Sequence, residues 1–167
     1  DSDGRIALSA NPADLPGYGS FALIYRVLGD GSETRASLRV FPVDTRVMIT
    51  DIDGTLTTSD TELFVDLFAE LLGGNFVPDA RVEAVEAMWT RTEQGYPLMY
   101  LTGRPYALTD ITREWLDDLG FPAGTVQLVA DVAEIAPNNG AVGTFKLRTL
   151  DTLVARGFVL DAAYGNA

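Results

Sequence analysis

Cysteine and histidine are absent from the 167 residues of this sequence. Without cysteine the chain can form neither disulfides nor thiolate metal sites, and its redox compartment is left open. Without histidine, acid–base chemistry must rely on carboxylates, lysine or tyrosine. Any bound metal should be a hard cation that prefers oxygen ligands. Both absences direct attention to the carboxylates.

Long apolar runs and positive charge are also scarce. No run approaches the roughly 20 apolar residues that span a bilayer, and no secretory signal segment is visible. Twelve Lys and Arg face 24 Asp and Glu, and the net charge of −12 opposes non-specific binding to nucleic acid or to an anionic membrane surface. We therefore expect no nucleic-acid partner and a soluble or peripheral protein. The sequence does not identify the compartment, although the cytoplasm is favoured.

The composition changes near residue 45, which predicts two regions. Before it, the β-prone runs Phe21–Leu28 and Ala36–Phe41 enclose a polar stretch at residues 29–32, a pattern typical of a β-hairpin. After it, apolar runs alternate with amphipathic helical patterns. We predict a short N-terminal β-strand region over residues 1–45, part of a sandwich-like segment, and an α/β domain over residues 46–167.

The α/β domain is predicted to hold a parallel sheet flanked by helices, because its strands look buried on both faces. The expected strands cover residues 47–50, 97–101, 125–130 and 158–164, and the expected helices cover residues 61–72, 80–92, 108–119 and 145–156. In such sheets ligands bind at the carboxyl ends of the strands. Polar residues at those ends are therefore the candidates for function.

A pair of acidic residues follows the first of these strands. The stretch VMITDIDGTLTTSD, residues 47–60, places Asp51 and Asp53 two residues apart, with Gly54 and Thr55 behind them. The pair suits phosphoryl transfer through an aspartyl-phosphate, in which Asp51 attacks phosphorus while Asp53 protonates the leaving oxygen and later deprotonates water. Gly54 would permit a tight turn whose N–H groups, together with Thr55, face the phosphoryl oxygens.

Two later segments supply matching polar residues. Thr102, Gly103 and Arg104 follow the second strand, and Lys146 lies near the start of the last predicted helix. Thr102 would donate its hydroxyl to the phosphate, and Lys146 would neutralise charge on phosphate and nucleophile. Arg104 would hold the phosphate or the head group, or would pair with a surface carboxylate. An anionic substrate beside an anionic nucleophile calls for a divalent cation, and Mg²⁺ suits oxygen ligands.

These motifs resemble a known family. DIDGTLT, LTGR and the later lysine look like the first three motifs of the haloacid-dehalogenase (HAD) phosphatases. Moreover, ITDIDGTLTTSD together with GYPLMYLTGRPYALTDITREWLDDLGFPAGTVQL resembles the catalytic domain of lipin-type phosphatidate phosphatases, which also occurs in retinal-degeneration-B-type phosphatidylinositol-transfer proteins. The resemblance implies a Rossmann-like HAD fold and Mg²⁺ held by the Asp51 carboxylate and the Asp53 backbone carbonyl.

The resemblance also sets an expectation about the fourth motif of the family, Gly-Asn followed by an Asp that completes the metal site. Gly165 and Asn166 match its beginning, and the printed sequence is expected to be truncated before that Asp. The leading hypothesis is Mg²⁺-dependent hydrolysis of phosphatidate or a related phosphomonoester, with possible contact to a membrane surface. Two alternatives stay open: a module that binds phosphatidate without catalysis, and a phosphatase for a soluble phosphometabolite.

Overall fold

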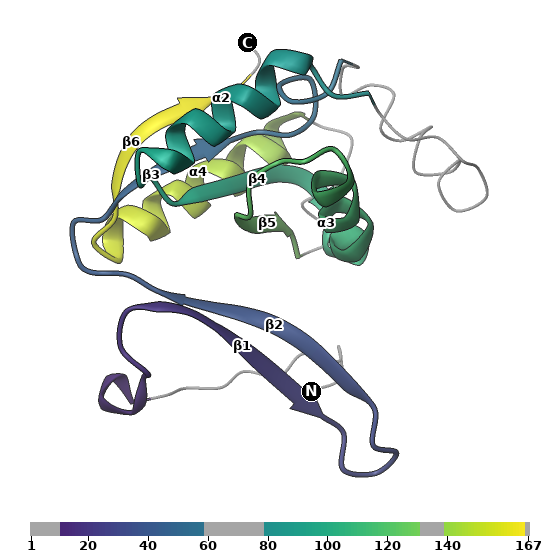
Figure 1. Cartoon of the computed structure of the whole chain (residues 1–167), viewed down its shortest axis with the longest axis vertical. Coiled ribbons are helices and arrows are strands. Elements are labelled where there is room, and N and C mark those ends of the chain that lie inside the picture. Colours follow the sequence, from purple (N-terminus) through teal and green to yellow (C-terminus); the bar gives the residue numbers. More distant parts are fainter. Residues whose placement is uncertain (1–10, 59–78, 131–138, 166–167) are drawn as a thin grey trace. The chain divides into compact units, whose positions relative to one another are not determined.

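The structure is a computed structural model that describes residues 11–58, 79–130 and 139–165. The chain forms two compact units, Asp1–Val43 and Asp44–Ala167. Their elements in chain order are η1 (Pro12–Asp14), β1 (Gly19–Arg26), β2 (Glu33–Val40), β3 (Arg46–Thr50), α2 (Val82–Glu93), β4 (Leu98–Pro105), η2 (Tyr106–Leu108), α3 (Thr109–Asp118), β5 (Thr125–Val129), α4 (Asn139–Ala155) and β6 (Val159–Tyr164) (Figure 1). That residues 1–45 and 46–167 form separate domains stays a prediction.

The N-terminal unit contains the predicted hairpin. Strands β1 and β2 pair antiparallel, with Gly19 opposite Val40 at one end and Arg26 opposite Glu33 at the other. The connecting turn is held by Asp30, whose Oδ1 accepts hydrogen bonds from the backbone N–H of Ser32 at 2.9 Å and from its hydroxyl at 2.7 Å. These two bonds lower the pKa of Asp30, because they stabilise its ionised form.

The larger unit is a Rossmann-like α/β fold, as predicted. Its four strands are all parallel and lie in the order β5-β4-β3-β6. The chain runs outward from β3 through β4 to β5 and then returns to place β6 on the other side of β3. Strand β3 is therefore central, and the strand order reverses at its carboxyl end. Ligands bind at this position in open α/β sheets.

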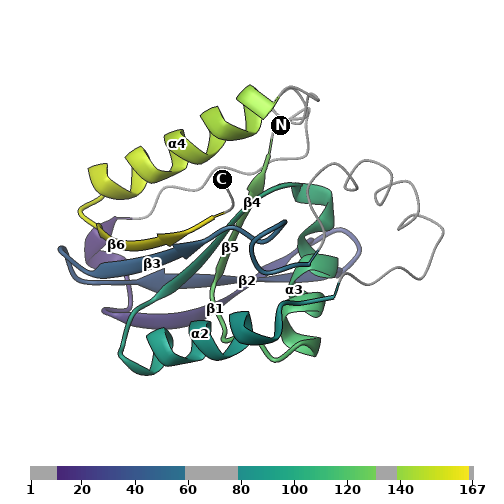
Figure 2. The ribbon, with the colours of Figure 1, turned by 90° about the horizontal axis from the view of Figure 1, so that it is seen from above.

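Helices cover both faces of this sheet. Helix α4 lies on one face, and α2 and α3 lie on the other (Figure 2). On the α4 side, Val47 and Ile49 of β3 share an apolar cluster with Phe145 of α4. On the α2 and α3 side, Met48 belongs to a second cluster that contains Trp115. Alternate residues of β3 thus face opposite layers, as the alternation of a strand requires, and both faces of the strand are buried.

Most predicted elements are present, with two differences in their bounds. Strand β4 runs to Pro105 and so includes the TGR segment that was predicted to follow it. Helix α4 begins at Asn139, six residues before the predicted start. The predicted helix at residues 61–72 lies outside the described residues. No helix among the described ranges is long and apolar enough to cross a membrane.

Candidate functional site

The loop after β3 is a tight turn built on one carbonyl. The carbonyl oxygen of Ile52 accepts hydrogen bonds from the N–H groups of Thr55, Leu56 and Thr57, at 3.2, 2.8 and 3.2 Å. Gly54, within this turn, has a φ of +73°, a backbone conformation that favours glycine. The predicted tight turn at Gly54 is therefore present.

Asp51 occupies the first position beyond β3 and pairs with Lys146. Its N–H donates to the Tyr164 carbonyl at 2.9 Å, so its backbone continues the pairing with β6. Lys146 Nζ donates to Asp51 Oδ2 at 2.5 Å, and the N–H of Ile52 donates to Asp51 Oδ1 at 2.9 Å. Lys146 reaches the site from α4, where it lies one turn beyond Val142. The structure brings together the predicted nucleophile and the predicted lysine.

The surroundings of Asp51 act on its protonation in opposite directions. Burial raises the pKa of this carboxyl, because desolvation disfavours the ionised form. The hydrogen bond and the charge of Lys146 oppose that effect, and the ionised Asp53 adds a smaller rise in the pKa. The side chain of Asp51 is 13% exposed, so one edge of it remains open to a ligand.

Asp53 is held in a different environment. Its carboxylate accepts three contacts from the Arg104 guanidinium: Nε at 3.2 Å to each oxygen and Nη2 at 2.8 Å to Oδ1. The hydroxyl of Thr102 donates to Asp53 Oδ2 at 2.9 Å. The two side chains of the ion pair are only 7% and 5% exposed. The second carboxylate of the motif is thus part of a buried, bidentate ion pair.

The two carboxylates lie on opposite faces of the sheet at its carboxyl end, and each is paired with its own cation. Asp51 is paired with Lys146 of α4 on one face, and Asp53 is paired with Arg104, which is packed against α3 on the other. The four groups sum to zero formal charge. Two carboxylates so close in sequence repel each other, and here a cation compensates each of them before any ligand binds.

The residues predicted to contact phosphate through the turn differ in availability. The N–H of Gly54 donates to the hydroxyl of Thr57 at 2.9 Å, so in this structure it is engaged within the protein. Thr55 Oγ1, by contrast, is the one buried side-chain polar atom in the described ranges that has no hydrogen-bond partner. A buried hydroxyl without a partner costs free energy unless something satisfies it. Thr55 is therefore the better candidate ligand of the two.

The residues of the TGR segment have partners other than a phosphate. Thr102 and Arg104 both contact Asp53, so the hydroxyl proton of Thr102 and two N–H groups of the Arg104 guanidinium are already engaged by that carboxylate. The predicted alternative for Arg104 was a surface carboxylate, whereas its actual partner is buried. Gly103 packs against α4: a Cβ built on it would lie 2.8 Å from Val142 Cγ1. Phosphate contacts by these three residues stay predictions.

The fit of the site to Mg²⁺ can be tested from its donors. No cluster of three or more acidic side chains that could hold a metal occurs in the described part of the chain. The carboxylate of Asp53 is engaged by Arg104, so the carboxylate of Asp51 remains as the acidic metal ligand. One carboxylate with backbone carbonyl and phosphate oxygens suits Mg²⁺, which is bound in proteins through one or two carboxylates. The donors therefore fit the ion in kind, and the predicted truncation before the fourth-motif Asp stays a prediction.

A shallow cavity of about 220 Å³ begins at this turn and extends along α2. Its lining is mainly apolar, and it is contributed by Thr55, Leu56, Arg81, Glu83, Ala84, Ala87, Met88 and Tyr164. Arg81, which lines the cavity, also contacts the turn: the Nε of Arg81 donates to the Thr57 carbonyl at 3.2 Å. The sequence prediction did not include this cavity, since residues distant in sequence form it.

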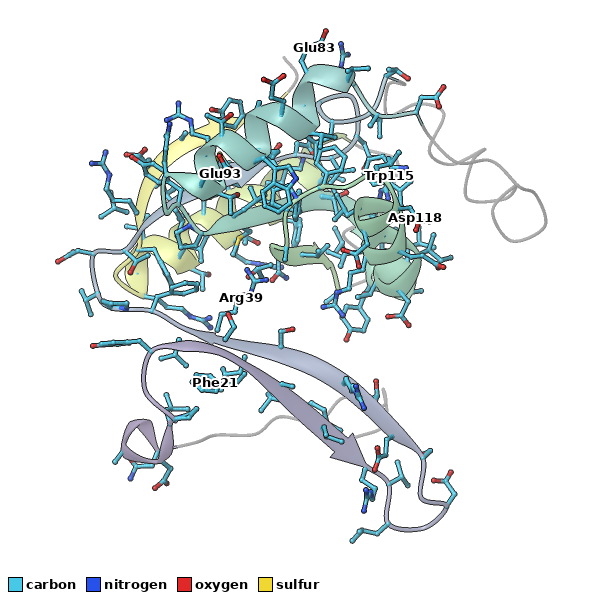
Figure 3. The ribbon with its side chains drawn as sticks, viewed as in Figure 1. Phe21, Arg39, Glu83, Glu93, Trp115 and Asp118 are labelled. Atoms are coloured by element: carbon cyan, nitrogen blue, oxygen red, sulfur yellow. The ribbon has the colours of Figure 1, made fainter. Side chains whose placement is uncertain are left out.

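Sequence reasoning also missed the support behind Asp53. Arg104 Nη1 donates to the Thr112 hydroxyl at 3.3 Å, and the guanidinium carbon lies 5.3 Å from the centroid of the Trp115 ring. Trp115 lies on α3 and is labelled in Figure 3. Thr112 and Trp115 are three residues apart and therefore share a helix face. That spacing is visible in TREWL, but the sequence does not show which residue the face contacts.

With the geometry of the site described, the sequence can be compared with those of known proteins. Residues 48–167 match the family described as "PITM 1-3, LNS2 domain". The chain is 30% identical over 168 residues to Protein retinal degeneration B of Drosophila melanogaster, a match that covers 100% of this chain and 12% of that protein. It is 28% identical over 126 residues to Membrane-associated phosphatidylinositol transfer protein 1 of Homo sapiens, covering 75% of this chain and 9% of that protein.

A relative with an enzymatic name is also found. Phosphatidate phosphatase PAH1 of Arabidopsis thaliana is 28% identical over 128 residues, covering 74% of this chain and 13% of that protein. The chain thus spans about a tenth of the length of these relatives. The family match covers more than half of the chain, including the turn after β3, the TGR segment and Lys146. This chain belongs to the family of LNS2 domains found in PITM 1–3 proteins.

Proposed function

We propose that this domain recognises the phosphomonoester head group of a phosphatidate-type lipid at the carboxyl end of β3 and hydrolyses it through Asp51. The observation that carries the proposal is the pair formed by Asp51 and Lys146, 2.5 Å apart at the reversal of the strand order. A partly open carboxylate beside a cation can attack phosphorus while the cation offsets the charge of the incoming phosphate. The unpartnered hydroxyl of Thr55 supplies a donor for a phosphoryl oxygen.

The reaction has two steps. In the first, a carboxylate oxygen of Asp51 forms a bond to phosphorus, the bond from phosphorus to the leaving alcohol oxygen breaks, and that oxygen takes a proton from Asp53. In the second, Asp53 removes a proton from water, the water oxygen attacks phosphorus, and phosphate leaves Asp51 as a free carboxylate. Mg²⁺, held by the Asp51 carboxylate and the Asp53 carbonyl, would supply positive charge to the phosphoryl oxygens.

Two observations support a lipid substrate. The cavity that starts at Thr55 is lined mainly by apolar side chains, so an apolar part of a substrate can lie beside the site. The relatives are named as a phosphatidate phosphatase and as phosphatidylinositol-transfer proteins. A net charge of −12 does not exclude an anionic head group, because Lys146 neutralises Asp51 and the proposed Mg²⁺ would add positive charge beside it.

A second candidate function is binding of the same head group without turnover. It is favoured by the buried ion pair of Asp53, because a carboxylate that accepts three contacts from Arg104 and one from Thr102 is poorly placed to reach a substrate. In that case Lys146 and Thr55 would hold the phosphate, and Asp53 would be structural.

One experiment separates the two functions. Phosphate release and vesicle binding would be measured with phosphatidate in phosphatidylcholine vesicles, for the wild-type protein at full length and for Asp51→Asn. Hydrolysis predicts a loss of turnover of several orders of magnitude in Asp51→Asn, with binding retained. The matched control is Asp118→Asn, an exposed residue at the end of α3, which should keep wild-type activity (Figure 3).

The possible outcomes lead to different conclusions. Wild-type protein that binds phosphatidate vesicles and releases no phosphate would establish the second function and refute hydrolysis. Release from glycerol phosphate that equals release from phosphatidate would refute the lipid assignment and favour a soluble phosphometabolite. Activity of Asp51→Asn within about tenfold of wild type would refute the aspartyl-phosphate step.

A further inference from the structure

We propose that Arg104 is a positioning residue that sets the orientation of the Asp53 carboxylate toward the substrate, rather than a ligand of the phosphate. The proposal rests on the hydrolytic function stated above. Arg104 is 4% exposed, and its guanidinium presents Nε and Nη2 to Asp53 and Nη1 to Thr112. All three guanidinium nitrogens thus contact protein groups, and two of them contact the Asp53 carboxylate. These contacts favour a role in holding that carboxylate.

The contacts around Asp53 form a closed ring. Thr102 donates its hydroxyl to Asp53 Oδ2 at 2.9 Å, and the same hydroxyl oxygen accepts the backbone N–H of Arg104 at 3.1 Å. The guanidinium of Arg104 then returns to Asp53 through Nε and Nη2. Thr102 and Arg104 lie two apart on β4, so both side chains point to the same face of the sheet. Asp53, Thr102 and Arg104 thus restrict one another's orientation.

Helix α3 holds the ring from behind. Thr112 accepts from Arg104 Nη1 at 3.3 Å, and the guanidinium lies over the Trp115 ring at 5.3 Å. Trp115 itself stacks on Phe121, with ring centroids 5.7 Å apart. The orientation of Asp53 is therefore coupled through Arg104 to the packing of α3. A proton donor must be held in a defined orientation as the leaving group departs, and this chain of contacts limits the orientations that the Asp53 side chain can take.

The planar fork of arginine is required for this role. A guanidinium offers two parallel donors that match the two oxygens of a carboxylate, whereas the lysine ammonium is a point charge on a flexible stem. Arg104→Lys keeps the charge that compensates Asp53 but loses the bidentate contact. The variant therefore tests orientation separately from charge.

The kinetic test compares two leaving groups. For Arg104→Lys we expect kcat to fall about a hundredfold on a short-chain phosphatidate, whose alcohol needs a proton as it leaves, and less than about tenfold on nitrophenyl phosphate, whose leaving group needs little. Binding of inorganic phosphate should be unchanged, because Lys146 and Thr55 are intact. The matched control is Arg113→Lys, the same substitution at an exposed position of α3, which should alter neither rate.

A purely structural role predicts a different pattern. Loss of a buried ion pair would lower the thermal stability and reduce both rates by the same factor. Equal factors on the two substrates, or a wild-type rate on phosphatidate in Arg104→Lys, would overturn the proposal. If Arg104→Lys fails to fold, Thr112→Val removes one contact of Arg104 at nearly constant volume and should show the same split between substrates in smaller measure.

A second measurement keeps the inference separate from the proposed function. Crystal structures of the wild-type protein and of Arg104→Lys would show the Asp53 side chain directly. We expect one conformer in the wild-type protein, with the Arg104 contacts given above, and a rotated or multiple Asp53 side chain in the variant. An unchanged Asp53 would overturn the positioning role whether or not the protein releases phosphate. A protein that hydrolyses neither substrate but shows the rotation would lose the proposed function, and Arg104 would retain the role of holding Asp53.

Discussion

Replacing Gly103 by alanine tests how closely β4 must approach α4. Gly103 lies in the middle of the TGR segment, and a Cβ added there would lie 2.8 Å from Val142 Cγ1 and 3.3 Å from Cγ2. Ordinary contacts begin at 3.4 Å, so the nearer atom would have to move by about 0.6 Å. The Val142 side chain is branched at Cβ and has few rotamers to escape into. The helix itself should therefore move.

The cost follows from two opposing contributions. Overpacking a well-packed region costs about 1–3 kcal/mol, whereas removing glycine from a strand interior returns about 0.5–1 kcal/mol. We expect Gly103→Ala to lower the free energy of unfolding by about 1–2 kcal/mol, measured by urea denaturation. Gly143→Ala, in α4 with open space around its Cβ, is the control and should be neutral or stabilising.

A double-mutant cycle identifies the contact. Val142→Ala removes the two methyl groups that Gly103→Ala would meet, and in the Gly103→Ala background it should restore stability rather than reduce it. We expect a coupling of about 1–2 kcal/mol between the two positions. The reasoning would be refuted if Val142→Ala cost the same in both backgrounds, or if Gly103→Ala were as stable as the wild-type protein. Because Lys146 lies one turn beyond Val142, a displaced α4 would also weaken its contact with Asp51.

Three further predictions concern other parts of the molecule. Gly124→Ala should lower the free energy of unfolding by about 1–3 kcal/mol in the same assay, because its Cβ would lie 2.5 Å from the buried ring of Tyr100; a variant as stable as wild type would contradict this. Ser32→Ala should raise the pKa of Asp30, followed by NMR titration, but only part of the way to its ordinary value, because it removes the hydroxyl hydrogen bond and leaves the larger contribution, from the backbone N–H of residue 32. The stabilisation from this turn is present above the unfolded pKa of Asp30 and is lost as the pH falls through its folded pKa; an unchanged titration would exclude the Ser32 hydroxyl as a cause. Chelation by EDTA should abolish phosphate release reversibly, and readdition of Mg²⁺ should restore it; release indifferent to EDTA would refute the metal proposal.

Most of the α/β fold could be predicted because its elements carry local signals. The apolar run before Asp51 and the helix stops at Gly120 and Gly157 place β3, α3 and α4 in order, and parallel pairing follows from the alternation of strands and helices. The start of α4 was missed because Gly140 and Gly143 disfavour helix locally. In the folded protein, Val142 of this segment packs against Gly103 of β4. The sequence does not reveal this contact.

The pairing of Asp51 with Lys146 could be predicted from the sequence, whereas the contacts of Asp53 could not. Asp51 and Lys146 meet as expected, because opposite charges at one sheet edge attract each other. Thr102 and Arg104 are polar, and a single sequence therefore suggests a loop after the strand. They belong to β4 because Asp53 satisfies them within the protein. Burial of polar residues depends on a partner 49 or 51 residues away, and no local pattern reports such a partner.

The separation of the two ion pairs has a consequence for how the domain can change over evolution. Asp51 and Lys146 are 13% and 28% exposed, so losing both removes no net charge and leaves no deeply buried group without a partner. Losing Asp53 would strand the buried guanidinium of Arg104, at a cost of about 3–5 kcal/mol for breaking a buried pair. Asp51, the proposed nucleophile, can therefore be replaced while the fold survives, whereas we expect Asp53 to be retained for folding even in a descendant that turns over no substrate. Asp53 would then persist where Asp51 has been replaced, and its presence alone would not indicate catalysis.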